Sequence, residues 1–86
     1  MNSLPVANRE QERFLNAIVA ERYKQDVIWG GRDHDQDHGW AAWAQILNER
    51  VQGLYGVFDP NPDSQARGRR LLIEIAAIAC AAFESR

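Results

Sequence analysis

The fold of this 86-residue chain is decided by the segment Leu71-Leu72-Ile73-Glu74-Ile75-Ala76-Ala77-Ile78-Ala79-Cys80-Ala81-Ala82-Phe83. Every residue in it except Glu74 is apolar, and many are alanine. A helix that is apolar on all sides must be covered on all sides, and two other helices in so short a chain cannot easily do that. We therefore predict that this helix associates with a second copy, because alanines let helix backbones approach closely. The predicted assembly is a two-fold homodimer with a helical bundle at its centre.

The residues before this segment predict two more helices and no strand. Asn8 and Gln11 fit a capping box at the start of the first helix. Its predicted apolar stripe is Phe14, Leu15, Ile18, Val19 and Tyr23. Steps of three and four residues define the stripe of the second helix, which is Trp40, Trp43, Leu47, Val51, Leu54 and Phe58. Prolines between residues 59 and 63 end that helix, and Asp63 or Ser64 is predicted to cap the third. The chain is thus predicted to be one all-α domain, residues 1–86, with helices over about 8–28, 39–58 and 64–84.

The tract from Trp29 to Trp40 gathers both histidines of the chain with several aspartates. His34, Asp35, Asp37 and His38 could ligate a divalent metal, since imidazole favours zinc and clustered carboxylates favour magnesium or manganese. The spacing matches no specific metal motif. The alternative is that Asp35 or Asp37 caps the second helix while the rest is a solvated loop.

A second candidate site lies near the start of the third helix. Arg67, Arg69 and Arg70 could bind a phosphate-bearing ligand, and Trp29 could stack on its base. The alternative for the arginines is pairing with acidic residues on the surface, and Trp40 is expected in the core. Glu74, alone among apolar residues, should pair with Arg22 or Arg50 or bind a metal.

The composition narrows the class of protein. Ten basic and twelve acidic residues give a net charge of -2, which argues against binding to nucleic acid or a membrane surface by charge. The first residues have no signal-peptide pattern, and no apolar run is long enough to span a bilayer. The single cysteine, Cys80, is expected to be a reduced, buried thiol in a cytoplasmic protein. No nucleophile paired with a base is apparent, so no catalytic residue is assigned.

Several segments resemble small proteins of bacteriophages and prophages that carry a WGG…HDxxH pattern. The matching segments are Glu21 to Gly31, His34 to His38, Trp43 to Arg50 and Leu71 to Arg86. More remotely, the chain resembles the MazG-like all-α nucleotide pyrophosphohydrolases. This resemblance implies a dimeric or tetrameric helical bundle that holds magnesium through glutamates on one helix and a glutamate and an aspartate on the next.

Carried over residue by residue, the MazG-like pattern keeps only Glu49 and Glu74 of five carboxylates. Arg50, Gly53 and Ala77 stand at the other three positions. The resemblance thus implies a phage-type binding protein without a competent catalytic cluster, which binds a nucleotide-like ligand or a host protein such as a defence-system component. The alternatives are a divergent metal-dependent nucleoside triphosphate pyrophosphohydrolase that uses the histidine tract with Glu49 or Glu74, and a regulatory dimer without a small ligand.

Overall fold

The computed structural model describes residues 8–29, 38–57 and 59–85, and over these residues it holds three helices and no strand. They are α1 (Arg9–Trp29), α3 (Trp40–Leu54) and α4 (Pro62–Ser85). The prediction of an all-α chain is confirmed. Among the described helices, none is long and apolar enough to cross a membrane.

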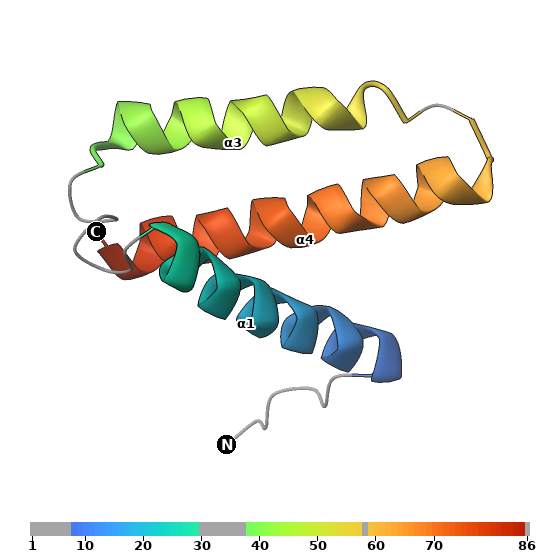
Figure 1. Ribbon diagram of the computed structural model, residues 1–86, viewed down its shortest axis with the longest axis horizontal. Helices are drawn as coiled ribbons and strands as arrows, with labels where there is room; N and C mark the ends of the chain where they lie inside the picture. Colours follow the sequence, from blue (N-terminus) through green and yellow to red (C-terminus); the bar gives the residue numbers. More distant parts are fainter. Residues whose placement is uncertain (1–7, 30–37, 58, 86) are drawn as a thin grey trace, which may run out of the picture.

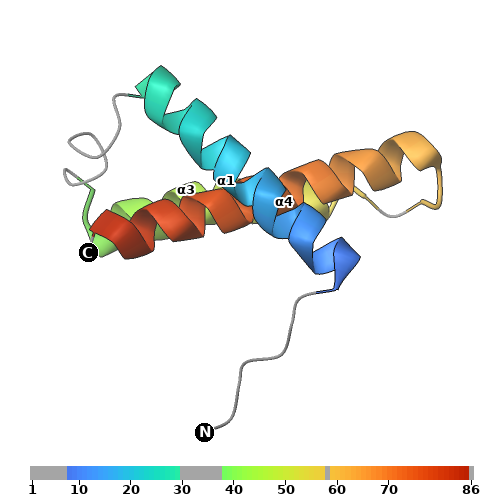
Figure 2. The ribbon, with the colours of Figure 1, turned by 90° about the horizontal axis from the view of Figure 1, so that it is seen from below.

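The three helices are arranged around α4, the longest of them. α3 runs antiparallel along one side of α4, while α1 crosses the other side at an angle (Figures 1 and 2). α1 and α3 each pack against α4 but make no contact with each other in the described part of the chain. The all-apolar segment is therefore the centre of the fold, as its composition predicts.

The helix ends follow local hydrogen bonding. The capping box at α1 is confirmed, because Asn8 N–H donates to Gln11 Oε1 and Gln11 N–H donates to Asn8 Oδ1, both over 2.8 Å. The predicted cap of the third helix is wrong by two or three residues. α4 begins at Pro62, whose fixed φ suits a first helical position, and Asn61 Oδ1 accepts a hydrogen bond from Asp63 N–H at 2.8 Å.

Both ends of α3 also differ from prediction. Gly39 occupies its N-cap and makes no side-chain cap hydrogen bond, while the predicted capping residues Asp35 and Asp37 lie outside the described residues. The helix ends at Leu54 rather than near residue 58, because Tyr55 and Gly56 turn the chain through hydrogen bonds to Gln52 O and Gly53 O.

The core lies between α3 and α4 and is small. Trp43, 4% exposed, packs with Ile78, Ala81 and Ala82, and Ile46 and Leu47 flank this cluster. The helices approach closely beside glycine, since a Cβ added at Gly53 would meet Leu71 Cδ1 at 3.1 Å. Trp40, which the stripe predicted to be core, is 67% exposed. It is the first residue of α3, one turn before Trp43 and the core cluster.

The face of α1 that packs on α4 holds only part of the predicted apolar stripe, since Phe14 lines a hollow between α1 and α4 and Ile18 is half-buried. Glu21 and Gln25 are its buried residues, whereas Leu15, Val19 and Tyr23 are exposed. Glu21 is drawn inward by an ion pair with Arg70 of α4. The most apolar side of α1 consequently faces away from α4.

The chain is more open than a compact domain of its size. Its radius of gyration is 14.7 Å, against about 12 Å for a compact domain of this length. Its accessible surface is 6664 Å², against about 5,200 Å² for a compact monomer of this mass.

Candidate functional site

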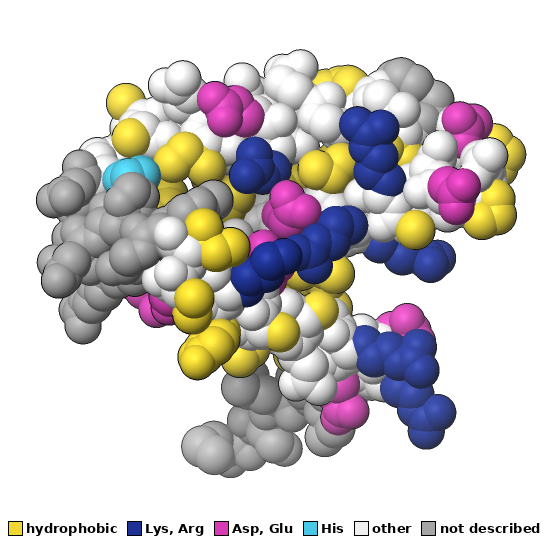
Figure 3. All heavy atoms as spheres, in the orientation of Figure 1, with side chains coloured by type: hydrophobic (Ala, Val, Ile, Leu, Met, Phe, Trp, Pro, Cys, Tyr) yellow, Lys and Arg dark blue, Asp and Glu magenta, His cyan; other side chains and the backbone are white. Residues whose placement is uncertain are grey.

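Ion pairs join all three helices on one face of the molecule. Arg70 pairs with Glu21 of α1 and, over 3.2 Å, with Glu74 in its own helix. Glu74 Oε1 also lies 3.2 Å from Arg50 Nε of α3, which makes no hydrogen bond, so this contact is purely ionic. Figure 3 shows basic and acidic side chains gathered near the centre of this face. The expectation that an arginine such as Arg50 pairs with Glu74 is confirmed.

A second polar cluster joins α1 to the C-terminal end of α4. Arg22 pairs with Asp26 over 2.9 Å and with Glu84 over 3.4 Å. Burial opposes the charge on Arg22, but the hydrogen bonds to Glu84 and Asp26 outweigh it and raise its pKa. The Cys80 thiol donates to Glu84 Oε1 over 3.0 Å. This hydrogen bond and burial raise the pKa of Cys80, which makes its thiolate scarcer at neutral pH.

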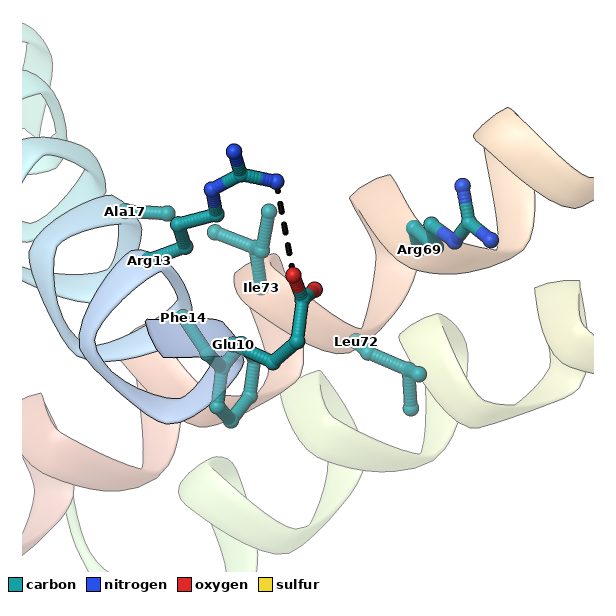
Figure 4. A pocket seen from close by; sticks show the side chains of 7 residues that line it. All are labelled: Glu10, Arg13, Phe14, Ala17, Arg69, Leu72 and Ile73. Carbon is teal, nitrogen blue, oxygen red and sulfur yellow. Dashed lines mark hydrogen bonds and ion pairs between the residues drawn. The ribbon is translucent and has the colours of Figure 1, made fainter. Parts of the chain in front are cut away.

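An apolar hollow of about 230 Å³ lies between the N-terminal half of α1 and α4. Figure 4 shows its wall formed by Phe14, Ala17, Leu72 and Ile73, with charged groups at its rim. Arg13 at the rim is paired with Glu10 over 3.4 Å. Arg69, on the opposite side, forms no ion pair with any other residue that the structure describes. The hollow can therefore receive an apolar group and present a guanidinium beside it.

The predicted metal ligands do not form a site in the described part of the chain. His34, Asp35 and Asp37 lie outside the described residues. His38 stacks at a tilt on Trp43, with ring centroids 4.8 Å apart. Glu49 is exposed, while Glu74 is held by two arginines. Across residues 8–29, 38–57 and 59–85, no group of three or more potential ligands could hold a metal ion.

The structure does not bring the predicted phosphate ligands together. Arg70 is engaged by Glu21 and Glu74, and Arg69 lines the hollow. Arg67 is two residues from Arg69, and successive helical positions turn by about 100°, so the two lie on nearly opposite sides of α4. Trp29 is the last residue of α1.

Two apolar rows are largely exposed in the structure, and the sequence predicted incomplete cover only for the row on the third helix. The outer ridge of α1 consists of Leu15, Val19, Tyr23 and Val27, which are 53% to 74% exposed. The α4 seam consists of Leu72, Ala76, Ala79 and Phe83, of which Phe83 is 86% exposed and Ala76 is half-buried. Each row has the spacing of an apolar helix stripe, which in an amphipathic helix faces the core. Only the packing of α1 and α3 on α4 shows that the rows remain uncovered.

In comparisons with protein-family models, curated protein sequences and solved structures, this chain matches none of them. The similarity to phage proteins and to MazG-like enzymes therefore remains a resemblance of sequence patterns. The chemistry of the site must be argued from the chain itself.

Proposed function

We propose that this chain is a non-catalytic binding protein that works as a homodimer and presents the outer ridge of α1 to a helix of another protein. The observation that carries the proposal is the exposure of that ridge. Its four residues lie on one helix and are spaced by four, yet α4 covers none of them. Contiguous exposed apolar surface of this kind marks interaction sites in soluble proteins.

The spacing of the ridge favours a helical partner. Rows of side chains four residues apart form ridges that pack into the grooves of a second helix. An amphipathic helix laid into such a surface is a recurring mode of peptide recognition. Tyr23 adds a ring that contributes apolar area and a hydroxyl for a polar contact at the edge.

The openness of the molecule supports the homodimer. A standard interface buries about 800 Å² per partner, which requires a continuous exposed apolar surface of the kind that α4 carries. The all-apolar segment of α4 is covered by α1 and α3 on two sides, while Leu72, Ala79 and Phe83 remain exposed. Self-association removes this surface from water.

The resemblance to phage proteins favours a host protein in the cytoplasm as the partner. Loss of three of the five MazG-like carboxylates favours binding over catalysis, because the metal cluster that would orient water on a triphosphate lacks most of its ligands. Glu74, one of the two carboxylates that remain, has become part of the ion-pair network.

The experiment places a photo-crosslinking amino acid at position 19 of the full chain and exposes it to lysate of the host cell. We expect one partner to be captured, and Val19→Glu on its own to abolish binding of that partner while the dimer persists. Glu12→Ala, a change on the same exposed side of α1, is the matched control and should bind normally. Unchanged binding by the Val19→Glu protein would refute the ridge as a docking surface. Hydrolysis of nucleoside triphosphates with magnesium or manganese would refute the non-catalytic assignment.

A further inference from the structure

The α4 seam has a pattern that suits pairing with another copy of itself. Leu72, Ala76, Ala79 and Phe83 are separated by steps of four, three and four residues, the spacing of a helix-pairing seam. Neither α1 nor α3 covers Phe83, and Leu72 is 49% exposed. Large residues stand at the two ends of the seam and alanines stand in the middle, where two helices crossing would come closest.

The spacing of the seam residues (four, three and four) is the same when α4 is followed from either end, so the seam can pair with an antiparallel copy of itself. In an antiparallel pair about a two-fold axis between Ala77 and Ile78, Leu72 lies opposite the partner's Phe83. Ala76 then lies opposite the partner's Ala79. A parallel pair would instead set Phe83 against the partner's Phe83 and leave the hollow unfilled.

The hollow lies at the position on α4 where the partner's Phe83 would pack in the antiparallel pair. In such packing a side chain enters a hole formed by four residues of the facing helix, and for the partner's Phe83 those are Arg69, Leu72, Ile73 and Ala76. Three of these four line the hollow, and Phe14 and Ala17 of α1 supply a further wall (Figure 4). Phe83 stands about 16 Å along the same helix from Leu72, given the rise of an α-helix.

We propose that a second copy of this chain docks antiparallel on the α4 seam and that each copy inserts Phe83 into the hollow of the other. The volumes agree, because an apolar cavity of about 150 Å³ holds a benzene ring and the hollow measures about 230 Å³. Arg69 is free to lie over the inserted ring, where a guanidinium is attracted to the aromatic face. This inference rests on the proposed homodimer and specifies how it is built.

The first test measures the dimer dissociation constant of the full chain by sedimentation. Each dimer contains two Phe83 insertions, so Phe83→Ala should weaken it at least about 100-fold, as expected for two buried aromatic anchors. Tyr55→Ala removes another exposed aromatic ring from outside the seam and should leave the constant unchanged. Equal helicity by circular dichroism establishes that both variants fold.

The second test determines the direction of the pair by disulfide trapping in a Cys80→Ala background. Leu72→Cys mixed with Phe83→Cys should give disulfide-linked mixed dimers in excess of the self-linked products. Predominant self-linked dimers would overturn the antiparallel pair.

The two proposals fail in different ways. A wild-type protein that stays monomeric at high micromolar concentration would refute the homodimer and this inference together. A wild-type dimer that Phe83→Ala leaves intact would refute only the insertion of Phe83.

Discussion

At the scale of single residues, Glu21 makes the main polar contact between α1 and α4. Its side chain is only 9% exposed and pairs with Arg70, which is about half-exposed. A buried carboxylate without a partner is costly, so this ion pair allows α1 to turn a charged residue toward α4.

Arg70→Ala should therefore lower the free energy of unfolding by about 1–2 kcal/mol, since it leaves the buried Glu21 carboxylate without a cation. The Gln25 amide, 3.5 Å from Glu21 Oε2, is then its remaining partner, and water screens part of the loss. Arg67→Ala removes the same charge from an exposed position in the same helix and should change stability by less than about 0.5 kcal/mol. Urea denaturation at fixed protein concentration measures both. Similar effects of the two substitutions would show that Glu21 does not depend on Arg70.

The Cys80 thiol gives a prediction about reactivity. Because the hydrogen bond to Glu84 raises the pKa of Cys80, the thiolate that reacts with alkylating agents is depleted at pH 8. Glu84→Gln removes the negative charge, lowers this pKa and should speed alkylation by iodoacetamide several-fold. Glu49→Gln, a change of the same charge on the exposed side of α3, should not. An unchanged or slower rate in the Glu84→Gln protein would contradict the assigned hydrogen bond.

At the scale of elements, periodicity predicted the existence and approximate bounds of all three helices, and the Asn8–Gln11 cap, because these depend on local sequence. It assigned the buried face of α1 only in part, since Phe14 and Ile18 lie toward α4 but the rest of the predicted stripe does not. Leu15, Val19 and Tyr23 are the more apolar choice, yet Glu21 is buried because Arg70 on another helix pairs with it. An interaction between residues 49 positions apart leaves no periodic signal in either helix.

The candidate site was less predictable than the helices for the same reason. The hollow combines Phe14 and Ala17 with Leu72 and Ile73, which are adjacent only after α1 crosses α4. Of the arginines singled out from the sequence, Arg69 lines this hollow, but Arg70 is used in an ion pair. Charge clustering along the chain therefore does not show which role each arginine has in the folded structure.

The N-terminus of α3 has no side-chain cap, and a single substitution at Gly39 can provide one. Gly39 is in an extended conformation at the N-cap, has no capping side chain, and a Cβ there would meet nothing within 4 Å. Gly39→Asp should accept a hydrogen bond from the first turn and complement the helix dipole, which raises the free energy of unfolding by about 0.5 kcal/mol. Gly39→Ala provides a Cβ without an acceptor and should not stabilise. Equal unfolding midpoints for Gly39→Asp and Gly39→Ala would contradict this account of the cap.

At the scale of the whole molecule, α4 supports α1 and α3, which make no contact with each other within residues 8–29, 38–57 and 59–85. Five apolar residues are buried among those that the structure describes: Trp43, Ala77, Ile78, Ala81 and Ala82. Three of the five are alanines, which contribute little burial each. Small domains with limited cores commonly gain stability by association. The small core and the exposed seam on α4 thus have the same cause, because part of α4 is covered by neither α1 nor α3.

If folding and dimer formation are coupled, thermal stability must depend on protein concentration. Each tenfold rise in concentration contributes about 1.4 kcal/mol per dimer, which corresponds to a rise in Tm of about 4 °C for a dimer of this size. Calorimetry between about 5 and about 500 µM protein should show this rise in Tm with each tenfold increase in concentration. Both the wild type and Tyr55→Ala should show it. Phe83→Ala should unfold at a lower temperature that barely changes with concentration, because its population is mostly monomeric. A wild-type Tm independent of concentration would mean that the three helices are stable alone, and the α4 seam would then need another explanation.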